Sequence, residues 1–247
     1  MKASYTDLIR HSAVYGVGQV LSRLASVILL PVYTRYLTPA DYGVIAILDL
    51  AAGILGIMVG VGLANAVQRF HFRTEEGLER NRLWWTGLAT VVSLAVVVVL
   101  PILWFRQPLA TALLGPNMDG AAFFVLLAAC TFCTRVLEQL LTVHLRVDKR
   151  STLLVGTNLV RLTVNITLNL VFLIHFRMGV AGILWGNLLT GILAVGWLLL
   201  LFIEKRGAPT FDTGHLQPLA KFGGPLVVTG LLALGMHRGD RYLLRVF

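Results

Sequence analysis

Three arginines lie inside apolar segments that are long enough to cross a lipid bilayer. Arg23, Arg135 and Arg161 are each flanked on both sides by hydrophobic residues. A guanidinium keeps its proton at physiological pH, and placing one at the centre of a membrane helix costs roughly 2.5 to 3.5 kcal/mol. Such residues normally face a watery cavity or an anionic partner. We therefore interpret these arginines as candidate contacts for an anionic substrate.

Other polar residues recur at helical spacing around these arginines. Positions separated by three or four residues share one face of a helix, and lipid cannot satisfy a polar face. The faces must therefore meet one another or line a cavity. The three sets are Asn158, Arg161, Asn165 and Asn169; Thr131, Arg135, Glu138 and Thr142; and, more loosely, Tyr15, Gln19, Arg23 and Ser26.

Two interpretations of these faces remain open. In the first, the faces hydrogen-bond to one another, and Glu138 and Asp49 neutralise two of the arginines. In the second, positive charge is in surplus, because Asp49 lies near the outer end of its segment, away from the inner arginines, and the surplus binds an anion. Arg135 and Glu138 are also spaced to pair within one helix.

The second interpretation defines a set of candidate site residues. Asp49 and Glu138 are candidates for coupling transport to an ion, and no residue is expected to be catalytic. The candidate substrate-binding residues are Gln19, Arg23, Arg135, Asn158, Arg161, Asn165 and Arg238.

The composition indicates a protein that crosses the membrane several times. The 247 residues are 57% hydrophobic and 13% charged, with a mean hydropathy of +0.79, whereas soluble domains carry about 25% charged residues. The net charge is +9, but the basic residues are scattered between apolar segments, which argues against a nucleic acid partner. Cys130 and Cys133 lack further metal ligands nearby and are interpreted as packing residues, so no metal or cofactor is expected.

Six apolar segments have about the twenty residues that a membrane helix needs. Lys and Arg outside the segments concentrate on the side of the amino terminus, which places that terminus in the cytoplasm. We expect a transmembrane lobe over residues 1–203, a cytoplasmic linker over 204–224 with a short interfacial helix, and a seventh helix over 225–247. The six segments are 12–34, 42–66, 83–105, 121–145, 152–175 and 179–203.

Two motifs carry a resemblance to a known family. Residues 29–43, LLPVYTRYLTPADYG, following GQVLSR at 18–23, resemble the start of the polysaccharide biosynthesis or O-antigen flippases (Wzx-like translocases) of the MOP exporter superfamily. Residues 221–226, KFGGPL, with Asp240, Arg241 and Tyr242 after them, resemble the family's seventh helix. The resemblance covers essentially the whole chain. It implies an all-α polytopic fold: the six-helix amino-terminal lobe of a MOP-type flippase plus the start of the second lobe.

The resemblance also implies a function. Such flippases have two lobes that rock about a cationic cavity and move polyprenyl-diphosphate-linked oligosaccharides from the cytoplasmic to the periplasmic leaflet of the bacterial inner membrane, without covalent chemistry. By this likeness Arg23 would line the amino-terminal lobe, and Arg135 and Arg161 would contact the diphosphate or acidic sugars. Because the chain ends within helix seven, we expect a truncated product, or a partner chain that supplies the second lobe.

Three alternatives compete with the flippase. A MATE-type antiporter shares the superfamily fold, but surplus arginine in its cavity would repel organic cations. A membrane enzyme of glycan assembly would need reactive groups on a sizeable loop, and the loops here are short. A structural membrane subunit without a substrate would not need a charged cavity.

Overall fold

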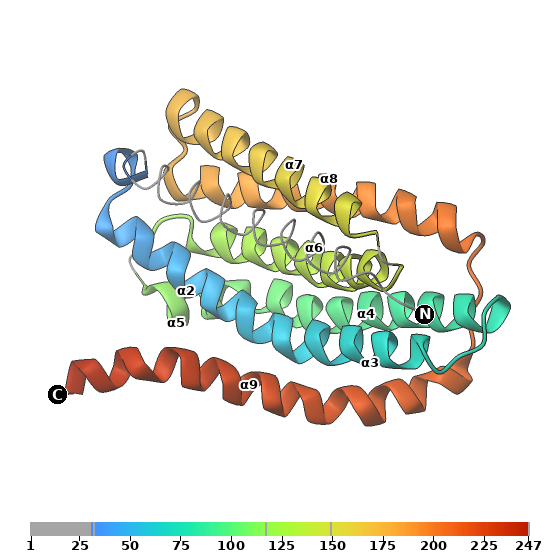
Figure 1. The fold of residues 1–247 in the computed structure, drawn as a ribbon. Coiled ribbons are helices and arrows are strands. Elements are labelled where there is room, and N and C mark those ends of the chain that lie inside the picture. The colour runs from blue at the N-terminus through green and yellow to red at the C-terminus, as the bar shows by residue number, and fades with distance from the viewer. Residues whose placement is uncertain (1–30, 32, 117, 149, 247) are drawn as a thin grey trace.

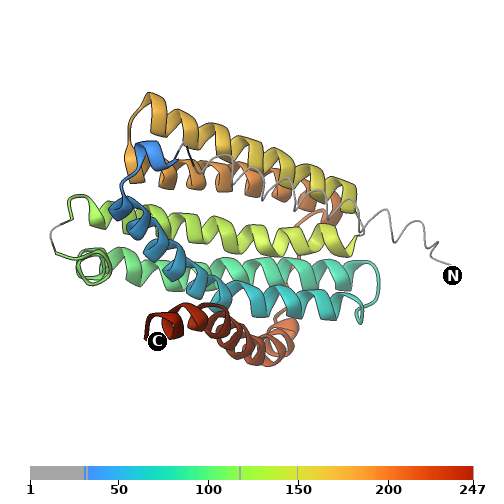
Figure 2. The same ribbon diagram turned by 60° about the vertical axis from the view of Figure 1, so that its left-hand side comes forward.

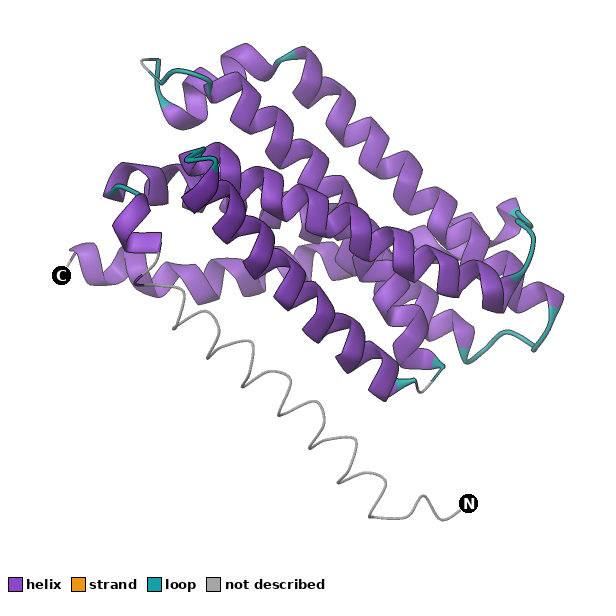
Figure 3. Ribbon diagram, turned by 90° about the horizontal axis from the view of Figure 1, so that it is seen from above, coloured by secondary structure: helices purple, strands orange, loops and turns teal. Residues whose placement is uncertain are grey.

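The computed structural model describes residues 31, 33–116, 118–148 and 150–246, with the side chains of 151, 231 and 234–246 left aside. All regular structure in these ranges is helical (Figure 3). The predicted first helix, 12–34, therefore lies almost entirely outside the described residues. The helices are α2 (Pro39–Gly56), α3 (Gly62–His71), α4 (Leu78–Trp104), α5 (Arg106–Leu114), α6 (Ala121–Val147), α7 (Ser151–Leu170), α8 (Gly179–Arg206) and α9 (Leu216–Val246), with π-helical turns η1 (Ile57–Val61) and η2 (Val171–His175) and a 3-10 turn η3 (Thr213–His215).

Within the described residues, five helical segments are long and apolar enough to cross a membrane, which confirms the polytopic, all-α prediction. The first runs without a break through α2, η1 and α3, and it begins with a capping box in which Thr38 and Asp41 bond to each other's backbone. Pro39 occupies the first turn of this helix, where its missing N–H costs nothing. The five segments are Pro39–His71, Leu78–Trp104, Ala121–Val147, Thr152–His175 and Gly179–Arg206.

Two elements differ from the boundaries expected from the sequence. The separate interfacial helix predicted within 204–224 is wrong, since η3 leads directly into α9 at Leu216 and the helix continues through Pro225. Asp212 caps η3 by accepting a hydrogen bond from the Gly214 N–H at 2.9 Å. The short helix α5 forms in a stretch that was expected to be a loop.

Helix α6 lies at the centre of the lobe and contacts α2, α3, α4, α5, α7 and α8. In Figure 1, α7 and α8 lie on one side of α6, α4 lies on the other, and α9 runs along α3 at the edge of the molecule. Figure 2 shows α9 well apart from the α7 and α8 pair. The loops at 72–77 and 207–215, together with Asp148 and Arg150, share one end of the bundle, which we call the basic end.

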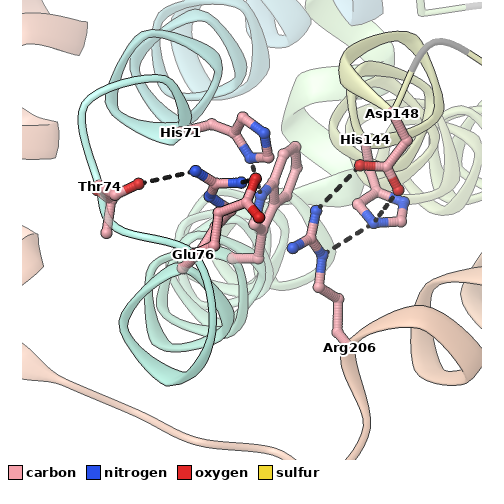
Figure 4. Close-up of polar contacts among 8 residues, drawn as sticks. His71, Thr74, Glu76, His144, Asp148 and Arg206 are labelled. Carbon is pink, nitrogen blue, oxygen red and sulfur yellow. Dashed lines mark hydrogen bonds and ion pairs between the residues drawn. The ribbon is translucent and has the colours of Figure 1, made fainter.

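A buried polar cluster ties four helices together at the basic end (Figure 4). Arg206 donates through Nε to His144 Nε2 at 3.0 Å and lies 3.4 Å from Asp148 Oδ1. Trp84 donates through Nε1 to His71 Nδ1 at 2.9 Å, and its ring lies 5.3 Å below the Arg206 guanidinium. Because these groups are buried and bonded to one another, the ends of α3, α4, α6 and α8 are held in register.

Glycines allow α8 to approach its neighbours closely. A Cβ on Gly186 would collide with the Asn169 side chain and lie 3.3 Å from the Asn169 backbone nitrogen, and a Cβ on Gly191 would collide with Thr134. Gly196, on the same helix, has no atom within 4 Å of the position that a Cβ would occupy. The close α7–α8 and α6–α8 contacts therefore depend on the missing side chains at Gly186 and Gly191.

This packing gives a stability prediction. Gly186→Ala is expected to lower the free energy of unfolding by about 1–3 kcal/mol, because the added methyl overpacks the α7–α8 contact. Gly196→Ala adds the same methyl to open space, and it should be neutral or stabilising by up to about 1 kcal/mol through helix propensity. Unfolding in detergent micelles measures both, and equal effects of the two substitutions would contradict the packing argument.

Candidate functional site

A polar hollow of about 350 Å³ opens between α3, α6 and α7. It brings together four of the predicted site residues, Arg135, Glu138, Asn158 and Arg161. The hollow lies within the membrane-crossing part of the bundle, because each of these residues belongs to a spanning segment. The lining comprises Ala64, Asn65, Arg135, Glu138, Gln139, Thr142, Val143, Arg146, Asn158 and Arg161.

Two ion pairs organise the hollow. Arg161 Nη1 lies 2.9 Å from Glu138 Oε1, and Arg135 Nη2 donates to Asp49 Oδ1 at 2.9 Å. The expectation that Asp49 lies away from the inner arginines is therefore wrong. Arg135 therefore pairs with Asp49 on α2 and not with Glu138 on its own helix α6. Glu138 is left free to pair with Arg161 on α7.

The two pairs change the charge balance expected from the sequence. Arg135 and Arg161 each have a carboxylate within 4 Å, as the first of the two interpretations requires. Arg146, which also lines the hollow, has no such partner among the residues that the structure describes. The surplus cation of the described lining is thus Arg146.

Sequence reasoning missed three polar lining residues, Arg146, Gln139 and Asn65. Arg146 was counted as a loop residue, although it follows Thr142 by four positions and therefore extends the same polar face of α6. Asn65 lies on α3 among apolar residues, and nothing in its spacing pointed to the hollow.

Asn165 and Asn169 bond to other side chains and do not line the hollow. The Asn165 amide donates to Asn187 Oδ1 at 2.9 Å and to Thr190 Oγ1 at 3.3 Å, both on α8. The Asn169 amide donates to the Tyr33 hydroxyl at 3.3 Å and to Asn165 Oδ1 at 3.2 Å. The polar face of α7 is therefore divided: Asn158 and Arg161 face the hollow, Asn165 joins α7 to α8, and Asn169 bonds to Tyr33 and Asn165.

Three predicted residues cannot be placed. Gln19 and Arg23 lie outside the described residues. Arg238 belongs to α9, but its side chain is not among those described. Their roles remain predictions.

Arg161 also lines a second, apolar groove of about 470 Å³ between α7 and α8. The groove is lined by Val160, Val164, Leu193 and Trp197. The side chains of Val160, Leu193 and Trp197 are exposed in the lobe. A single arginine therefore stands between a polar hollow and an apolar groove. This arrangement suits a ligand that carries an anionic group on an apolar chain.

The unequal burial of the two carboxylates gives a testable difference. Glu138→Gln is expected to lower the free energy of unfolding by about 1–2 kcal/mol, because this side chain is only 11% exposed and bonds a cation. Asp49→Asn should cost about 0–1 kcal/mol, since both members of its pair are more than one-third exposed. Unfolding in micelles compares the two, and a larger loss for Asp49→Asn would contradict the assignment.

This chain spans about half the length of the solved structures that it matches here. A MOP superfamily transporter from Pyrococcus furiosus, described as having a binding pocket of reverse polarity, superposes with a TM-score of 0.69 at 16% identity over 91% of this chain and 52% of its own. An outward-facing MATE multidrug resistance transporter superposes with a TM-score of 0.72 at 16% identity, over 93% of this chain and 53% of its own. MATE in a bent conformation superposes with a TM-score of 0.69 at 18% identity, over 93% of this chain and 54% of its own. These likenesses show the fold.

Sequence comparison identifies the family. A search of the curated proteins found no match. Residues 32–244, however, match the sequence profile of the family described as polysaccharide biosynthesis protein. This match covers most of the chain, and its membrane-spanning helices have the arrangement of one half of a MOP superfamily transporter. The chain therefore belongs to the polysaccharide biosynthesis protein family.

Proposed function

We propose that the chain forms the amino-terminal half of a translocase that flips a lipid-linked oligosaccharide across the membrane. The observation that carries this proposal is the position of Arg161 between the polar hollow and the apolar groove. A polyprenyl diphosphate joins the same two chemistries, an anionic head and an apolar chain. The hollow accepts the diphosphate and its first sugars, and the groove keeps the polyprenyl chain in contact with lipid.

The lining suits binding more than covalent chemistry. Guanidinium groups bind phosphate oxygens in pairs, and the amides of Asn158, Gln139 and Asn65 are suited to sugar hydroxyls. Arg146 meets the substrate first, because it has no carboxylate to displace among the described residues. Arg161 then exchanges Glu138 for a phosphate oxygen.

This exchange of partners gives the carboxylates a role in coupling. When phosphate binds Arg161, Glu138 loses its cation in a site where it is nearly buried, and uptake of a proton or a sodium ion restores neutrality. Asp49 and Arg135 form a parallel pair that opens in the same way. The second lobe, supplied by further polypeptide or by a partner chain, closes the cavity from the opposite side, because alternating access requires two units.

The proposed location is the bacterial cytoplasmic membrane, with the amino terminus and the basic end facing the cytoplasm. The loops and adjoining helix ends at that end carry Arg73, Arg80, Arg82, Arg150 and Lys205, and the cytoplasmic side retains such residues preferentially. Substrate from cytoplasmic glycan assembly would then enter from the basic end.

An antiporter for cationic drugs is the second candidate, because several solved structures of this fold are MATE transporters. The binding pocket of the Pyrococcus furiosus protein is described as having reverse polarity. In this chain, the positive charge that Arg146 adds to the two ion pairs of the hollow disfavours a cationic substrate. Export of cationic dyes that is independent of glycan synthesis would favour the antiporter.

Substitution in the full-length protein tests the flippase. Arg161→Ala and Arg135→Ala together are expected to reduce glycan export roughly tenfold or more, because each removes a charge-assisted phosphate contact. The matched control is Arg82→Ala, which removes an exposed arginine that pairs with Glu79 at the basic end. Surface glycan measured at equal membrane abundance of the variants gives the comparison. Intact export in the double variant would refute the role of the hollow.

A further inference from the structure

A second cationic hollow, of about 600 Å³, lies between the end of α3 and the start of α9. Three cations line it, Arg69 from α3, Arg73 from the loop after α3 and Lys221 from α9, and no carboxylate is among the lining residues. None of the three lies within 4 Å of an acidic group in the described part of the chain. Their charges are thus available to an anion.

Aromatic packing holds one of these cations in place. The Arg69 guanidinium lies 4.3 Å from the centroid of the Phe222 ring. The Phe70 ring meets Phe222 edge to face, with centroids 6.3 Å apart. A stacked guanidinium keeps its N–H groups directed outward in its own plane, so Arg69 is oriented for an oxygen-rich ligand before the ligand arrives.

The two walls of the hollow are fixed by a glycine contact. A Cβ on Gly62 would collide with the Gly223 carbonyl oxygen, and a Cβ on Gly223 would lie 3.2 Å from the carbonyl carbon and oxygen of Gly62. The backbones of α3 and α9 therefore touch beside the hollow. This contact keeps Lys221 opposite Arg69.

The hollow lies at the depth of lipid head groups. The spanning segment Pro39–His71 ends two residues after Arg69, and Arg73 follows in the loop at the basic end. Basic pockets between membrane helices at this depth bind phospholipid head groups that carry more than one phosphate. Three cations around 600 Å³ suit two phosphates better than one.

We propose that Arg69, Arg73 and Lys221 form a binding site for a lipid head group with two phosphates. Two lipids offer this chemistry: diphosphatidylglycerol of the bulk membrane and a polyprenyl diphosphate. Only the second source rests on the proposed function. Asn65 of the central hollow precedes Arg69 by about one helical turn on α3, so one face of α3 leads from this site to the central hollow.

Lipid binding by the full-length protein in detergent micelles tests the site. The probes are diphosphatidylglycerol, phosphatidylglycerol with one phosphate, an uncharged phospholipid, and a polyprenyl diphosphate without sugars, each followed by native mass spectrometry and thermal unfolding. The variant is Arg69→Gln with Arg73→Gln and Lys221→Gln. The control, Arg82→Gln with Arg150→Gln and Lys205→Gln, removes the same charge from exposed positions at the same end, outside the hollow.

The site variant is expected to bind two-phosphate lipids roughly 10- to 100-fold more weakly than the wild type. The control should bind them as the wild type does, and binding of the uncharged lipid should not change in either variant. If the triple variant does not fold, Arg73→Gln with Lys221→Gln leaves the Arg69 packing intact and should lose part of the affinity. Equal binding by site variant and control overturns the proposal.

The four probes distinguish the source of the head group. If the site variant loses affinity only for the polyprenyl diphosphate, the hollow is a docking site for substrate. If it loses affinity for diphosphatidylglycerol to the same extent, the hollow is a site for bulk lipid. Both results support the proposal. The proposal is overturned if the site variant loses as much affinity for phosphatidylglycerol as for the two-phosphate lipids. Because the measurement requires no transport, its failure leaves the proposed function standing, and failed transport by the Arg161 and Arg135 variants leaves this site standing.

Discussion

The ion pair between Arg161 and Glu138 results from the constraint on which the rest of this structure depends, the absence of hydrogen-bond partners in lipid. Lipid offers no hydrogen-bond partner, so each polar group within the spanning segments must find one inside the protein. The lobe satisfies this requirement in two ways. Some polar groups hydrogen-bond to other helices, as Asn165 does to Asn187 on α8. Others, such as Arg135 and Arg161, have partners but remain partly exposed in a hollow.

The exposure of a paired polar group distinguishes a structural role from a ligand-binding role. His144 and Arg206 are buried and bonded at the basic end, where they hold helices together. Arg135 and Asp49 are also paired, but their side chains are 39% and 49% exposed. A partly exposed pair can exchange its partner for a ligand at modest cost, whereas opening a buried cluster would leave charges without solvation. We therefore assign ligand binding to the hollow and rigidity to the cluster.

Helix periodicity predicted the spanning segments well, because segment length and apolar composition are local properties of the sequence. It placed Arg135, Glu138 and Arg161 on polar faces, but it could not tell which neighbouring helix each face meets. Asn165 was for this reason grouped with Arg161, although close α7–α8 packing at Gly186 turns it toward α8. The reach of Asp49 to Arg135 likewise depends on how α2 crosses α6, which is a tertiary property. Pro225 signalled a helix start, yet α9 begins at Leu216, nine residues earlier.

The position of Arg161 also limits the order of events in transport. While Glu138 holds it, the guanidinium is neutralised, and the net attraction of the hollow for an anion comes from Arg146. A diphosphate attracted by Arg146 must then compete with a carboxylate that is already in place at 2.9 Å. The competition favours a ligand with more than one charge and rejects a single carboxylate, since only the former can compensate for the loss of the existing pair. In the proposed function, selectivity for diphosphate over simpler anions follows from the ion pair itself, because a weak competitor cannot displace Glu138.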